Sequence, residues 1–201
     1  MTDPHPIEPL VIDEPARLRP DVRTVLRPGV RFLLAHPAHA IALGFGAGLS
    51  PVAPGTVGTL WAWLAFVVMG RWLDDAGWAL VIAAAFAVGW WACTRSARDL
   101  GVADPGSIVW DEVVAFWIVL WFVTPAGLAM QAAAFALFRA FDAVKRGPVG
   151  WADRLFKPRG AADGAPSIGP REGFGVMFDD LVAAGCTLLV IAVAVALWRV
   201  W

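Results

Sequence analysis

Two pairs of neighbouring acidic residues, Asp111–Glu112 and Asp179–Asp180, each stand directly before a long apolar run of the chain. A carboxylate at such a position is costly in a protein core and more costly in lipid. The same arrangement occurs twice, which indicates a shared purpose. Carboxylate oxygens suit a hard cation such as Mg²⁺, so we expect both pairs to face one metal ion together with one phosphate group.

Further acids and several cations lie close to these pairs in the sequence. Basic side chains can hold a phosphate through charge-assisted hydrogen bonds. Taken singly, each basic residue also fits a lipid headgroup contact or an ion pair, such as Arg139 with Asp142 at i,i+3. The candidate ligands of a metal or of a water molecule are Asp111, Glu112, Asp142, Asp153, Asp179 and Asp180, and the candidate phosphate ligands are Arg139, Lys145 and Arg154.

Several other phosphatase chemistries lack the residues that they need. The three histidines, His5, His36 and His39, all precede the acidic segments, which argues against a histidine nucleophile. Neither Cys93 nor Cys186 is followed by the C-x5-R pattern of cysteine phosphatases, and we expect both to be inert thiols in apolar runs. No D-x-D-x-T segment marks an aspartyl-phosphate enzyme. A metal-activated water attacking phosphorus remains.

The composition predicts a membrane protein. Of the 201 residues 59% are hydrophobic, and there are 12 tryptophans and no tyrosine. The mean hydropathy is +0.64, which is higher than a soluble domain of this length needs. The net charge of -1 gives no indication of a nucleic-acid partner. Residues 1–35 lack the apolar core of a signal peptide, so we expect the first membrane helix to direct insertion.

The chain divides into an N-terminal arm and one membrane domain. Residues 1–31 are rich in proline and charge, which is typical of a disordered or loosely attached basic arm. Residues 32–201 form the expected all-α, multi-helical integral membrane domain, with about five membrane-associated helices. Pro37 divides a short interfacial or re-entrant piece at 32–43. The expected helices cover residues 57–73, 78–94, 104–123, 128–141 and 176–198.

Two parts of this plan have alternatives. Residues 104–141 contain Pro125 and Gly127 between two apolar arms, which predicts a helical hairpin, with one kinked helix of 25 residues as the competing interpretation. The glycine-rich residues 44–59 form either a tight packing turn or an anion-binding loop. In the second case Thr56 caps the following helix, whose exposed backbone N–H groups bind the anion.

The hairpin places nearly all positive charge on one side of the membrane. Of the 16 lysines and arginines, only Arg71 and Arg199 fall on the other side. The positive-inside rule then assigns the crowded face to the cytoplasm. Both acidic pairs lie on that face, so a single cytoplasmic-face active site is possible.

Four segments, in order, resemble the phosphatidylglycerophosphatase A family. They are GFGAGLSPVAPGTVGT at 44–59, GSIVWDEVV at 106–114, FRAFDAVK at 138–145 with WADR at 151–154, and GFGVMFDDLVAAG at 173–185. The resemblance covers roughly residues 40–190. It implies an all-helical, Mg²⁺-dependent enzyme of the bacterial inner membrane that hydrolyses phosphatidylglycerophosphate to phosphatidylglycerol and phosphate. The six acids, Ser50, Thr56, Arg139, Lys145 and Arg154 all match the family's motifs, and the resemblance places Ser50 and Thr56 with the three basic residues at the phosphate.

The chain also departs from the family pattern. Lys145-Arg146-Gly147-Pro148 replaces Lys-Pro-x-Pro, Ala115 replaces a glycine, and residues 158–171 form an inserted flexible loop. Two other classes of function stay open at this stage. A transporter or channel could use the acids as an ion or proton site, although no inverted repeat is visible. A structural lipid-binding protein could carry them without catalysis.

Overall fold

The structure is a computed structural model that describes residues 28–144, 147–156 and 168–200. The described residues form helices and no strand, which confirms the all-α prediction. A 3₁₀ segment, η1, follows the first two short helices. The elements are α1 Val30–Ala35, α2 Pro37–Ala42, η1 Gly44–Leu49, α3 Pro54–Met69, α4 Asp75–Leu100, α5 Trp110–Val123, α6 Leu128–Val144, α7 Gly147–Phe156 and α8 Pro170–Val200.

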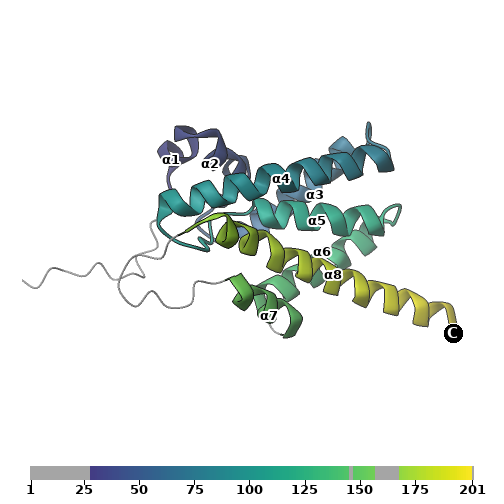
Figure 1. Ribbon diagram of the computed structural model, residues 1–201. Coiled ribbons are helices and arrows are strands. Elements are labelled where there is room, and N and C mark those ends of the chain that lie inside the picture. Colours follow the sequence, from purple (N-terminus) through teal and green to yellow (C-terminus); the bar gives the residue numbers. More distant parts are fainter. Residues whose placement is uncertain (1–27, 145–146, 157–167, 201) are drawn as a thin grey trace, which may run out of the picture.

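Helix α5 lies at the centre of the bundle (Figure 1). It packs against α3, α4, α6 and α8, and α8 also packs against α4, α6 and α7. Every residue from Trp110 to Trp117 is buried, so α5 has almost no exposed face. An apolar helix that is buried all round is a core element, and it positions Asp111 and Glu112 inside the protein.

Two helices are long and apolar enough to cross a membrane. They are α4, with 26 residues and a hydropathy of 1.7, and α8, whose 30 residues Pro170–Arg199 have a hydropathy of 2.6. Only 28% and 17% of their most apolar stretches are buried within the protein. Apolar surface of this extent that faces outward indicates membrane association. Helices α3, α5 and α6 have 16, 14 and 17 residues and are shorter than a spanning helix usually is.

The predicted hairpin is confirmed. Helix α5 ends at Val123, the chain turns at Thr124 and Pro125, and α6 begins at Leu128 and packs back on α5. A single kinked helix is therefore wrong. Figure 1 shows this turn, the α3–α4 turn and the C-terminus at one end of the molecule. The start of α5 and the start of α8 lie toward the other end, with α1 and α2.

Three details differ from the prediction. Thr56 does not cap α3, because the helix begins at Pro54 after Ala53, whose φ of 46° and ψ of 58° are left-handed. Proline suits this first helical position because its φ is already helical. Helix α4 continues past the apolar run to Leu100 and ends at Gly101 in the left-handed conformation, a common helix stop. The sequence analysis does not predict α7, since this segment has no long apolar run.

Two predicted segments, the N-terminal arm and the inserted loop, fall partly outside the described residues. Most of the N-terminal arm and most of the 158–171 insertion are not described, although Val30 and Arg31 open α1. Pro170 and Arg171, at the end of the predicted insertion, are the first residues of α8. Cys93 is buried and Cys186 is half-buried, and both are free thiols.

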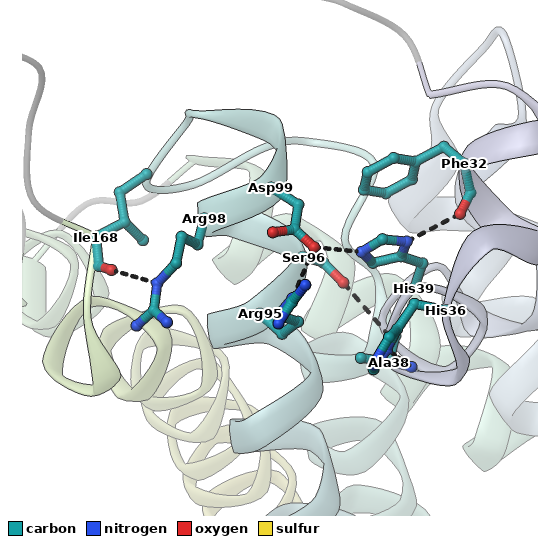
Figure 2. A network of polar contacts seen from close by, with 9 residues as sticks. All are labelled: Phe32, His36, Ala38, His39, Arg95, Ser96, Arg98, Asp99 and Ile168. Atoms are coloured by element: carbon teal, nitrogen blue, oxygen red, sulfur yellow. Dashed lines mark hydrogen bonds and ion pairs between the residues drawn. The ribbon is translucent and has the colours of Figure 1, made fainter.

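The short N-terminal helices are tied to α4 by a polar network, named here the outer network (Figure 2). The His39 ring lies 2.9 Å from the Phe32 carbonyl oxygen through Nδ1 and 2.9 Å from Asp99 Oδ2 through Nε2. Arg95 Nε donates to the same Asp99 oxygen at 2.7 Å. His39 is buried, and its function in the described structure is to attach α2 to α4.

Candidate active site

Five of the six predicted acids are buried together where α5, α6 and α8 meet. Their exposed fractions are 9% for Asp111, 8% for Glu112, 8% for Asp142, 5% for Asp179 and 3% for Asp180. The Asp180 carboxylate lies within electrostatic range of the other four. Acidic side chains are almost never this buried unless they are paired or bind a ligand. The structure therefore brings the two acidic pairs to one site.

Arg139 of α6 holds part of this site together. Its Nη1 atom lies 2.9 Å from Glu112 Oε1 and 2.8 Å from Asp142 Oδ2. The same nitrogen lies 3.4 Å from the hydroxyl of Thr59 on α3, and that hydroxyl donates to the Gly55 carbonyl at 2.9 Å. We call Glu112, Arg139, Asp142 and Thr59 the inner cluster. It joins α3, α5 and α6.

Two glycines of α3 make room for the inner cluster. A Cβ atom at Gly55 would clash with the Glu112 carboxylate and would lie 2.9 Å from Arg139 Nη2. A Cβ at Gly58 would lie 2.7 Å from Val109 Cβ and 3.2 Å from Glu112 Oε2. The glycine-rich segment is therefore a close-packing element at its C-terminal end. This supports the packing interpretation for Gly55 and Gly58.

Asp111 and Asp180 differ from the acids that Arg139 neutralises. The Glu112 backbone N–H donates to Asp111 Oδ1 at 3.0 Å. Asp180 Oδ2 is a buried oxygen with no hydrogen-bond partner among the described residues. A buried oxygen of this kind costs about 1–3 kcal/mol, and more when it is charged. Such an oxygen is available to a bound cation.

The sixth predicted acid, Asp153 of α7, lies near Asp179. Both line a cavity of 20 Å³, about the space of one water molecule. Asp104 and Glu172 also line this cavity, and sequence reasoning missed them. The signal for Asp104 was its position at the start of the 104–123 stretch, and that for Glu172 was its position seven residues before Asp179, two helical turns away on the same face.

The predicted phosphate ligands are less closely gathered than the acids. Ser50 donates to the Val52 carbonyl at 2.8 Å and lines a groove of 260 Å³ beside Gly106 and Ser107. Thr56 is half-buried in the first turn of α3, and Arg154 is exposed on α7. Lys145 lies outside the described residues. Among the predicted phosphate ligands that the structure describes, Arg139 lies within hydrogen-bond distance of two buried acids, Glu112 and Asp142.

The donor atoms of the buried acids suit a magnesium ion, although the acids are not arranged as a formed metal site. Among the described residues, no group of three or more His, Cys, Asp or Glu side chains is arranged as a formed metal site. The carboxylates nevertheless offer only oxygen donors, which Mg²⁺ prefers, and Asp180 Oδ2 is an unsatisfied one. The neighbouring carboxylates repel one another, and a divalent cation bound between them would draw them closer.

The fold and site define a class: a helical, membrane-associated protein with a buried carboxylate site near one end. The family model of phosphatidylglycerophosphatase A matches residues 40–195. The chain belongs to the phosphatidylglycerophosphatase A family, and is thus an enzyme of the lipid phosphatase class. This confirms the resemblance carried by the four motifs.

Individual relatives support this membership. The chain is 37% identical to phosphatidylglycerophosphatase A of Escherichia coli over 76% of its length and 80% of the relative's. It is 35% identical to that of Haemophilus influenzae, over 82% of the chain and 92% of the relative. A relative from Bacteroides thetaiotaomicron, 37% identical over 77% of the chain and 91% of its own length, is provisionally named a phosphatidylinositol-3-phosphatase. No solved structure is significantly similar to the chain.

Proposed function

We propose that the protein hydrolyses phosphatidylglycerophosphate to phosphatidylglycerol and phosphate in phospholipid biosynthesis. Family membership supports the substrate, and one structural observation carries the chemistry. This observation is the burial of Asp111, Glu112, Asp142, Asp179 and Asp180 at one place beside Arg139. A surplus of buried carboxylates is expensive for stability alone and is explained by a catalytic cation.

Asp111, Asp179 and Asp180, with Glu112, would hold Mg²⁺. A bound Mg²⁺ supplies charge stabilisation at the phosphoryl oxygens and lowers the pKa of bound water. Glu112 shares its charge with Arg139, so we assign it the weaker ligand role. Asp111 and Glu112 would thus have different roles, which is consistent with neighbouring residues on a helix pointing about 100° apart.

Asp153 is better placed than Asp142 to orient or deprotonate the attacking water. Asp153 lines the cavity beside Asp179 that has about the space of one water molecule, and Asp142 binds Arg139 at 2.8 Å. The water oxygen would form the new bond to phosphorus as the bond to the glycerol oxygen breaks. Asp153 would accept one proton from water. The leaving glycerol oxygen would take up one proton from solvent to become the hydroxyl of phosphatidylglycerol, and Asp153 would then return its proton to solvent.

Arg139 can also serve the phosphate. Both of its ion pairs use Nη1, and its Nη2 has no hydrogen bond to a described residue. A guanidinium held by two carboxylates is fixed in orientation and can present its second amino group to a phosphate oxygen. Arg154, Lys145 and the Ser50–Thr56 backbone remain the proposed further contacts.

We further propose that five helices, α3, α4, α5, α6 and α8, associate with the bacterial inner membrane, with the active face cytoplasmic. The short helices α3, α5 and α6 would enter only part of the bilayer, while α4 and α8 cross it. The grouping of element ends in Figure 1 and the positive-inside count of the sequence support this orientation.

The test is phosphate release by purified protein in detergent with Mg²⁺. Asp111→Asn and Asp179→Asn should each lower the rate by about 100-fold or more, since each removes a charge from the cation site. The matched control is Asp75→Asn in the first turn of α4, which should stay close to wild type. Folded Asp111→Asn and Asp179→Asn proteins with near wild-type rates would contradict the assigned site.

The substrate is tested in the same assay with a panel of lipid phosphates. Phosphatidylglycerophosphate should be hydrolysed fastest. A faster rate with phosphatidylinositol 3-phosphate would instead place this chain with its Bacteroides relative in substrate choice. No specific observation favours a transporter, because the buried acids gather near one end and do not follow a path along α5 or α8.

A further inference from the structure

A groove outside the active site combines exposed tryptophans with arginines at the polar end of α4. It has a volume of 410 Å³, and its walls include Trp90, Trp91, Arg95, Arg98 and Pro170. Trp90 is 38% exposed and Trp91 is 50% exposed. The two charged residues that line the groove are both arginines, and Asp99 pairs with Arg95 just outside it.

The walls of the groove are fixed by contacts within the protein. Trp90 Nε1 donates to the Pro170 carbonyl at 2.6 Å, which links the groove to the first turn of α8. The Trp91 ring lies 5.8 Å from the His36 ring. The tryptophan side of the groove is thus held by α8 and by the start of α2.

The two arginines are held by one nitrogen each. Arg95 Nε donates to Asp99 Oδ2 at 2.7 Å, and Arg98 Nε donates to the Ile168 carbonyl at 3.1 Å (Figure 2). The Nη groups of both make no hydrogen bond to a described residue. Residues three apart on a helix share a face, so two guanidinium groups can present their amino groups to one anion.

The position of the groove along α4 matches the headgroup layer of a bilayer. Trp91 lies in the last turn of the apolar run of α4, which ends at Thr94, and Arg98 lies about 10 Å beyond Trp91 along the helix axis at 1.5 Å per residue. Tryptophan rings prefer the boundary between hydrocarbon and headgroups, and the layer beyond it holds the lipid phosphates. Trp91 and Arg98 therefore fit the acyl boundary and the phosphate of one lipid.

We propose that this groove binds the headgroup phosphate of an anionic phospholipid at a site separate from the catalytic acids. The lipid chains would pass along Trp90 and Trp91, and Arg95 and Arg98 would hold the phosphate. Two exposed guanidinium groups, with one neighbouring carboxylate, that of Asp99, leave positive charge that complements a lipid with net negative charge and favours it over a zwitterionic lipid. The inference rests on the proposed membrane placement and not on the proposed reaction.

Native mass spectrometry of the detergent-purified protein tests the site without turnover. The probes are dioleoyl phosphatidylserine and dioleoyl phosphatidylcholine at equal concentration, because neither is the proposed substrate or product. Wild type should retain phosphatidylserine preferentially. The Arg95→Gln/Arg98→Gln variant should lose this preference by about 25-fold, since each of the two basic residues near the headgroups contributes about a factor of five.

The matched control, Arg71→Gln/Arg199→Gln, removes two arginines from the opposite end of the molecule and should keep the preference. An equal loss in both double variants would overturn the proposal, as would an unchanged preference in Arg95→Gln/Arg98→Gln. Competition by soluble glycerol 3-phosphate at equal concentration would also overturn it, because the occupant would then be a free phosphate ester.

Two further variants keep the test valid if the glutamine double variant misfolds. Arg95→Lys/Arg98→Lys keeps both charges and should keep most of the preference, whereas Trp91→Ala should weaken retention of both lipids. If the lysine variant loses the preference as fully as the glutamine variant while Trp91→Ala changes nothing, the groove is not the lipid site. Phosphatase activity is not needed for any of these results.

Discussion

The inner cluster and the outer network both place one ionisable group between partners on different helices, yet they are built differently. In the outer network Asp99 faces His39 and Arg95, and the side chains of Asp99 and Arg95 are 28% and 48% exposed. In the inner cluster Arg139 faces Glu112 and Asp142 with 19% exposure. Three more buried acids lie within electrostatic range there, so negative charge is in excess among the described residues.

This difference separates a structural role from a functional one. A balanced, half-exposed network attaches one helix to another at little cost. A buried site with excess carboxylates destabilises the protein unless a cation completes it. The proposed catalytic role would account for the buried acids around Arg139, and attachment of α2 accounts for the outer network. Changes in the two regions should have effects of different size and kind.

The largest effect on stability is expected from Arg139→Met. The variant leaves Glu112 and Asp142 buried without their cation, which should lower the free energy of unfolding by about 3–5 kcal/mol. Chemical denaturation in detergent micelles measures this loss. Arg139→Lys keeps the charge and should recover part of it. A loss below about 1 kcal/mol for Arg139→Met would show that the inner cluster is not held by this ion pair.

A smaller loss is expected from Gly55→Ala. The added methyl group has no space beside the Glu112 carboxylate and Arg139, and overpacking of this kind costs about 1–3 kcal/mol. Gly185→Ala on α8 is the control, because a Cβ there meets nothing within 4 Å. Alanine is also the better helix former at Gly185. Thermal unfolding of both variants, followed by circular dichroism, should separate them; equal stability would contradict the close contact.

The smallest effect is expected in the outer network. Asp99→Asn removes a carboxylate that is partly exposed, so the free energy of unfolding should fall by about 0.5–1 kcal/mol. Phosphate release should remain close to wild type, because Asp99 lies outside the site. A large loss of activity with unchanged stability would mean that the two regions are coupled, which would weaken the comparison.

Much of the fold could be predicted because its signals are local. Apolar runs placed α3, α4, α5, α6 and α8, and Pro125 with Gly127 marked the hairpin. The ends were harder. The apolar run ends at Thr94, but α4 continues to Leu100. The polar residues of its last turns remain helical, with Arg95 bonded to Asp99 four residues later, and Gly101 ends the helix. Helix α7 has no long apolar run and needs α8 to pack against.

The site could be predicted by residue type but not by partner. The two acidic pairs could be recognised because charged residues beside apolar runs are energetically costly, and both pairs are buried in the structure. Pairing between distant residues left no local signal: His39 and Asp99 are 60 positions apart, and Thr59 and Arg139 are 80 apart. Arg139 was expected both as a phosphate ligand and as an ion-pair partner of Asp142. The structure shows the ion pair, with Glu112 as an additional partner.

The most direct test compares activity and stability in Asp180→Asn. Asp180 is 3% exposed, and its Oδ2 has no hydrogen-bond partner among the described residues. If the acid is kept for a catalytic cation, the variant should release phosphate about 100-fold more slowly or worse. In Mg²⁺-free buffer it should unfold no more easily than wild type, because a buried charge is gone. Near wild-type phosphate release by the folded variant, or a clear loss of stability without Mg²⁺, would contradict this role.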